Sequence, residues 1–113
     1  MALSGAQVAK FVRAIAVLAL DADGQIAWLA SLGPVAIDEL ALEFDDGIRL
    51  FPQFLDLGWL RADLEVALAD IDRQLLDMSD ASDKDLWSAK ALATDTRWAD
   101  LRLLARSALN MIH

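Results

Sequence analysis

Apolar residues recur at alternating steps of four and three positions in two separate parts of the chain. The first series consists of Leu64, Leu68, Ile71, Leu75 and Met78. The second repeats the heptad spacing and consists of Trp98, Leu101, Ala105, Ala108 and Ile112. Because this spacing aligns side chains along one face of a helix, it predicts two long amphipathic helices, over about 59–78 and 96–111, with matching apolar seams.

The start of the chain predicts a third long helix, ending near Leu20. Ser4 and Gln7 have the spacing of a capping box, which favours a helix start after Ser4. The run Ala14–Leu20 is apolar on every side, which is typical of a buried, central helix. No segment shows the sustained alternation of a β-strand. We therefore predict an all-α fold, a compact single-domain helical bundle over residues 1–113 with about five to seven helices, several of them short.

Clusters of Gly, Pro and Asp divide the rest of the chain into shorter helices. These are expected at about 25–32, 35–44, 52–57 and 83–93. Pro34 is suited to the first turn of the second one. The triplet Asp45-Asp46-Gly47 predicts a turn that ends it, and Gly58 is a candidate cap after the third. The segment Ser79–Asp85 reads as a polar linker.

The stretch from Ile48 to Leu60 is unusually apolar, since eight of its thirteen residues are large and apolar. Its simplest placement is as a lid across the core of the three long helices. Both of its faces are apolar, so its outer side is expected to meet another chain. Trp59 directly follows Gly58 at an expected helix start, and we predict that its side chain is partly exposed.

Several residue types needed for common catalytic chemistry are missing. The chain has no Cys and no Tyr, and its single histidine is His113. Thiolate chemistry is therefore excluded, and a histidine base or metal site is not expected. The longest apolar run spans seven residues, far fewer than the roughly 20 that a membrane helix needs. We expect no enzyme, cofactor, metal site or membrane span, and a bacterial, cytoplasmic protein.

Charge is concentrated in the middle of the chain. The net charge is −8, and residues 35–85 hold fourteen acids and four bases, whereas residues 86–113 hold two acids and four bases. Such a field repels nucleic acids and anionic lipids and attracts basic proteins. The alternative is that the acids only keep a leucine-rich chain in solution. Arg102 and Arg106 share a face and are expected to pair with the acidic middle.

These features predict a small, acidic, non-enzymatic protein-binding module. Its most concrete form is an inhibitor similar to immunity proteins and antitoxins, which neutralises a basic protein partner. The residues expected to contact that partner are five acids and three aromatic residues: Asp38, Glu39, Glu43, Asp45, Asp46, Phe51, Phe54 and Trp59. Two alternatives stay open. The chain could be a self-associating, dimeric structural bundle, or a bundle that binds a small apolar ligand in its interior rich in Trp and Leu.

Overall fold

The structure, a computed structural model, describes residues 4–112, and His113 lies outside these residues. Within them the chain forms seven α-helices, one short 3-10 helix and no strand. The elements are α1 (Gly5–Ala19), α2 (Ala22–Ser31), α3 (Glu39–Ile48), α4 (Phe51–Asp56), α5 (Leu64–Asp80), η1 (Lys84–Trp87), α6 (Ala89–Thr94) and α7 (Thr96–Ile112). The predicted all-α fold is confirmed.

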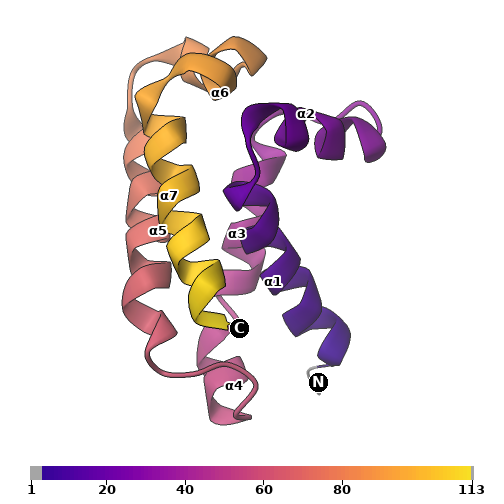
Figure 1. Ribbon diagram of the computed structural model, residues 1–113, viewed down its shortest axis with the longest axis vertical. Coiled ribbons are helices and arrows are strands. Elements are labelled where there is room, and N and C mark those ends of the chain that lie inside the picture. Colours follow the sequence, from indigo (N-terminus) through magenta and orange to yellow (C-terminus); the bar gives the residue numbers. More distant parts are fainter. Residues whose placement is uncertain (1–3, 113) are drawn as a thin grey trace.

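Four helices form a ring around the core. Helix α1 packs against α3 on one side and α7 on the other, α7 also packs against α5, and α3 and α5 close the ring along a smaller contact. Figure 1 shows α2 and α6 at one end of the ring and α4 at the other. The core is therefore formed by the helix α3 together with the three long helices that the sequence predicted.

The predicted apolar seams lie inside the ring. All five residues of the α5 series are buried, as are Trp98, Leu101, Ala105 and Ala108 of α7. The first helix begins as predicted, with the backbone N–H of Ser4 donating to Gln7 Oε1 at 2.7 Å. Its residues Phe11, Ile15 and Leu18 are also buried, which confirms that the first helix is central.

The turn predicted at Asp45-Asp46-Gly47 is wrong, because these residues continue α3. Gly47 faces α1 inside the bundle, and a Cβ atom built on it would lie only 2.1 Å from Phe11 Cδ1. The absent side chain lets the two helices approach closely. Tertiary packing therefore outweighs the turn preference of this triplet.

Three other helices also have limits that differ from the predicted ones. Helix α2 begins at Ala22, because Asp21 caps it by accepting a hydrogen bond from Gly24 N at 2.8 Å. Pro34 does not open a helix, and α3 starts only at Glu39. Helix α5 starts at Leu64 rather than at Trp59, and it extends to Asp80.

The predicted helix over 83–93 is divided into η1 and α6. Ser88 separates them with an extended backbone, and its hydroxyl accepts a hydrogen bond from Ala91 N at 3.1 Å. Ser88 therefore acts as the N-cap of α6, and a cap requires non-helical backbone angles. The break predicted around Asp95 is confirmed, because α7 begins at the next residue.

The apolar stretch over 48–60 forms the end of α3, helix α4 and the connection to α5. Gly58 has a positive φ of 73° and follows α4, as its candidate role as a cap predicted. Figure 1 shows α4 at one end of the bundle, where Phe54 stacks on Phe11 with ring centroids 6.0 Å apart. The stretch thus covers one end of the core as a lid. That its outer side meets another chain stays a prediction.

Candidate functional site

The five acids expected to contact a partner all belong to α3 or directly precede it. Because Leu40, Phe44 and Gly47 point into the core, the acids occupy the remaining faces of this helix. Their positions divide them between its two flanks. Asp38 and Asp45 lie on the α5 side, whereas Glu39, Glu43 and Asp46 lie on the α1 side.

The solvent-facing side of α3, between these flanks, carries an exposed leucine. Leu42 is 51% exposed. Two acids of α3 have ion-pair partners: Asp45 with Arg49 at 2.8 Å and Glu43 with Lys10 at 3.9 Å. Within residues 4–112, Asp38, Glu39 and Asp46 have no basic group within 4.0 Å. Three carboxylates are therefore free to attract a cation near an exposed apolar side chain.

An open groove separates α3 from α5. It consists of two adjoining hollows of about 470 and 210 Å³, which share Ala41, Leu42 and Ser79. The full lining of this α3–α5 groove is Ala36, Asp38, Ala41, Leu42, Phe44, Asp45, Asp72, Leu75, Leu76, Ser79 and Trp87. The groove exists because α3 and α5 have the smallest contact of the neighbouring helices in the ring.

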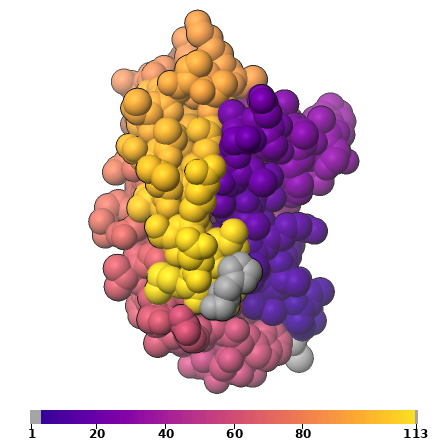
Figure 2. All heavy atoms as spheres, viewed as in Figure 1, coloured from indigo at the N-terminus to yellow at the C-terminus, as the bar shows by residue number. Residues whose placement is uncertain are grey.

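Charge is separated between two sides of the bundle. Residues 38–80, which include α3 and α5, hold twelve acids and three bases, whereas α1 and α7 together hold five bases and one acid. Figure 2 shows α7 and α1 side by side on one face. The acids are thereby concentrated on the side of α3 and α5, whereas Lys10 of α1 pairs with Glu43 and Arg97 of α7 pairs with Asp83 and Asp95. The resulting field directs a positively charged partner to the α3–α5 side.

The prediction that Arg102 and Arg106 pair with the acidic middle is wrong. Gln25 is fully buried and donates to the carbonyls of residues 17–18, at 3.2 and 3.1 Å. Arg106 Nε donates to the carbonyl of Ala19 at 2.8 Å, and Arg102 Nε donates to Gln25 Oε1 at 3.3 Å. The last carbonyls of a helix lack partners within it and carry partial negative charge. These three side chains therefore serve to close the end of α1.

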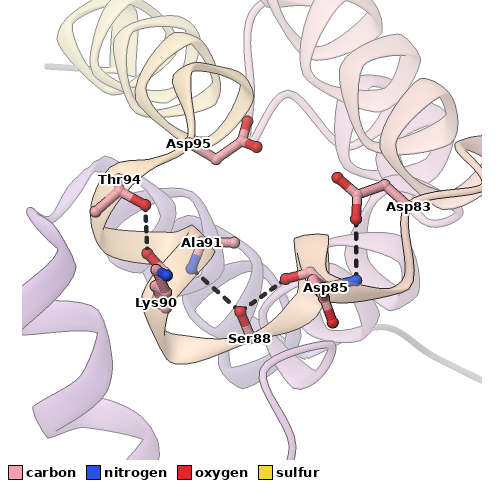
Figure 3. A pocket seen from close by; sticks show the side chains of 7 residues that line it. All are labelled: Asp83, Asp85, Ser88, Lys90, Ala91, Thr94 and Asp95. Carbon is pink, nitrogen blue, oxygen red and sulfur yellow. Dashed lines mark hydrogen bonds between the residues drawn. The ribbon is translucent and has the colours of Figure 1, made fainter.

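A second hollow, of about 340 Å³, lies beside η1 and α6. Figure 3 shows its lining residues Asp83, Asp85, Ser88, Lys90, Ala91, Thr94 and Asp95. Their hydrogen bonds hold local turns, and Arg97 pairs with Asp83 at 3.0 Å and with Asp95 at 2.8 Å. Over residues 4–112 there is no cluster of three His, Cys, Asp or Glu residues placed to hold a metal ion. Arg97, at the start of α7, therefore acts as a clamp that joins the residue before η1 to the residue before α7.

The clamp predicts a pH dependence. Side-chain and backbone hydrogen bonds from Arg97 lower the pKa of the Asp95 carboxyl from 3.8 to about 2. A depressed pKa stabilises the folded state above pH 3.8, and this contribution is lost as the pH falls toward 2. Asp95→Asn should therefore lower the melting temperature at about pH 5, and the difference from the parent protein should shrink as the pH falls through about 2 and vanish below it.

The control is Asp100→Asn, because Asp100 is an exposed residue of α7. This change should leave the melting temperature nearly unchanged at both pH values. NMR titration of the Asp95 carboxyl measures its pKa directly. A value close to 3.8 would contradict the proposed clamp.

Of the three aromatic residues expected at a partner surface, two are in the core. Phe51 and Phe54 are the buried residues of α4, and their rings close one end of the ring of helices. Trp59 is 41% exposed, as predicted, and stacks on Phe54 with centroids 6.3 Å apart. A partner that meets the folded chain therefore reaches Trp59 but not the two phenylalanine rings.

Only Asp38 and Asp45 of the eleven groove residues were predicted from the sequence to contact a partner; the other nine, which include Leu42, Asp72 and Leu76, were missed. Leu76 stands one position after Leu75, outside the apolar stripe of α5, and is 55% exposed. Leu42 has the same relation to Ala41 on α3. The sequence signal for the groove was a leucine just outside the apolar stripe on both α3 and α5. This signal can be interpreted only when the two helices are known to be neighbours.

Comparisons of the chain with protein-family models, curated proteins and solved structures gave no match. None of the helices within residues 4–112 is long and apolar enough to cross a membrane. The function is therefore argued from the chain's own residues.

Proposed function

We propose that this protein is a binding module that captures a basic protein partner on the exposed surface of α3, next to the α3–α5 groove. The observation that carries the proposal is the placement of the free carboxylates of Asp38, Glu39 and Asp46 around the exposed Leu42. Charged groups that border an apolar contact steer a partner and fix its orientation, while the apolar contact holds it.

In its most specific form, the proposal is stoichiometric inhibition of a basic toxin or nuclease, in the manner of immunity proteins and antitoxins. An enzyme that acts on nucleic acid needs Lys and Arg side chains to bind phosphates. The carboxylates on α3 would form ion pairs with those side chains and thereby exclude the nucleic acid. This inhibitory role is supported by charge alone and is tested once a partner has been isolated.

The first test changes the sign of the free carboxylates. The triple variant Asp38→Lys, Glu39→Lys, Asp46→Lys should weaken binding of a captured and purified basic partner by about 10- to 100-fold. The affinity of the parent protein should also fall between about 50 and about 300 mM salt, because salt screens charge attraction. Isothermal titration calorimetry measures both effects.

A matched control separates local from overall charge. The variant Asp77→Lys, Asp80→Lys, Asp100→Lys changes the net charge by the same amount at exposed positions outside the groove and away from α3. It should reduce the affinity far less than the α3 variant. Equal losses in the two variants would contradict a role for α3, and an affinity independent of salt would contradict capture by charge.

Self-association is the second candidate, and it has its own supporting observation. Ten large apolar side chains within residues 4–112 are exposed, and a dimer could cover part of them. Size-exclusion chromatography with light scattering distinguishes the two proposals. A mass of 12.3 kDa supports partner capture, whereas twice that mass favours the dimer.

The small-ligand alternative has less support, because the interior around Trp98 is filled by packed side chains.

A further inference from the structure

The α3–α5 groove has the shape of an unfilled position in a helical bundle. Its floor is apolar and includes Phe44 and Leu75, and Leu42 and Leu76 rise on its two walls with half of their surface exposed. The groove continues past Ala41 and Ser79 to Trp87. The hollow between α1 and α3 is smaller, at about 140 Å³, so the seam between α3 and α5 is where an additional helix finds apolar contacts on both sides.

Both walls of the groove are acidic. Asp38 and Asp45 stand on the α3 wall, and Asp72 stands on the α5 wall. Asp45 already pairs with Arg49, whereas Asp38 and Asp72 have no basic group within 4.0 Å among residues 4–112. An occupant with a cation on only one flank would leave one wall uncompensated. The charge pattern therefore calls for basic residues on both flanks of an apolar ridge.

Building on the proposed function, we infer that the α3–α5 groove receives an amphipathic helix of the partner, with a leucine-like ridge flanked on both sides by Lys or Arg. The α5 wall runs from Asp72 to Ser79, which corresponds to about 10 Å along a helix. The docked segment thus spans two to three turns, with about three apolar residues at positions i, i+3 or i+4, and i+7.

A second copy of this chain fits the groove poorly. A two-fold contact that placed groove against groove would bring Asp38, Asp45 and Asp72 of two copies together. Like charges in a desolvated contact are destabilising. The two acidic walls therefore favour a basic helix from a different protein over self-pairing through this groove.

The test uses a synthetic helix as the probe. A fluorescently labelled peptide of about 14 residues carries Leu at i, i+4, i+7 and i+11 with Lys on both flanks. A second peptide has the same composition but distributes its Leu residues around the helix. Fluorescence anisotropy measures the affinity of each, and the protein variants Leu76→Lys and Leu103→Lys are compared with the parent protein.

The two variants are matched because both replace an exposed leucine with a cation. Leu76 lines the groove and is 55% exposed, whereas Leu103 lies on α7 and is 60% exposed. Leu76→Lys should weaken binding of the patterned peptide by at least about tenfold, and Leu103→Lys by no more than about twofold. The parent protein should prefer the patterned peptide over the redistributed one. Circular dichroism melts establish that both variants are folded.

The possible failures of the two proposals are distinguishable. Equal binding of the two peptides, or equal effects of Leu76→Lys and Leu103→Lys, would overturn the helix-docking inference. The proposed function would survive that result if the α3 charge variant still lost affinity for its basic partner. A dimer that dissociates on Leu76→Lys would also overturn the inference, because it would place a second copy in the groove.

Discussion

Replacement of Trp98 by alanine is expected to lower the free energy of unfolding by about 3–5 kcal/mol. The Trp98 side chain has no exposed surface and is the largest one in the core. Its ring meets that of Trp87 edge to face at a centroid distance of 5.2 Å, and its indole N–H donates to the Leu86 carbonyl at 2.8 Å. The truncation leaves a cavity and removes the partner of a buried carbonyl, and both effects are destabilising.

Trp59→Ala is the matched control for this prediction. Trp59 is 41% exposed and lies in the connection after α4. Its truncation removes less buried surface, so the loss should be at most about half of that of Trp98→Ala. Urea unfolding followed by circular dichroism measures both. Equal losses would show that the two tryptophans contribute equally to the core, contrary to the structure.

Gly47→Ala is expected to destabilise the fold by about 1–3 kcal/mol, although alanine favours a helix more than glycine does. The added Cβ would lie 2.1 Å from Phe11 Cδ1 and 2.7 Å from Phe11 Cγ. Phe11 is itself buried and packs on Phe44 at a centroid distance of 5.6 Å, so its ring has little room to move. The α1–α3 contact must therefore open.

Gly5→Ala tests the same substitution without the steric conflict. A Cβ built on Gly5, in the first turn of α1, meets no atom within 4 Å. This variant should be neutral or stabilising by up to about 1 kcal/mol. If Gly47→Ala proved as stable as Gly5→Ala, the close packing of α1 on α3 would be refuted. Gly47→Ala should also weaken partner binding, because it displaces α3, which forms one wall of the groove.

The local pattern of residues was sufficient to predict the main helices. The 4-3 spacing from Leu64 to Met78 placed α5 in the core, and Ser4 with Gln7 marked the start of α1. These predictions succeeded because helix periodicity and caps depend on residues within a few positions of each other. The acidic character of the middle region and the absence of cysteine were likewise fixed by composition.

Predictions failed where residues distant in sequence meet. Gly47 looked like a turn residue, yet it lies within α3, where its missing side chain leaves room for Phe11, thirty-six positions earlier. Arg106 looked like an ion-pair partner for the acidic middle, yet it caps the end of α1 at Ala19. Both outcomes depend on which helices become neighbours, and no local pattern specifies that.

The candidate site is also a product of the tertiary structure. The sequence by itself determined that Asp38, Asp45 and Asp72 are acidic and that Leu42 and Leu76 lie beside apolar stripes. Only the ring of four helices placed these side chains on facing walls of one groove. The physical reason is that periodicity orients a side chain around its own helix, whereas packing between helices decides what it faces.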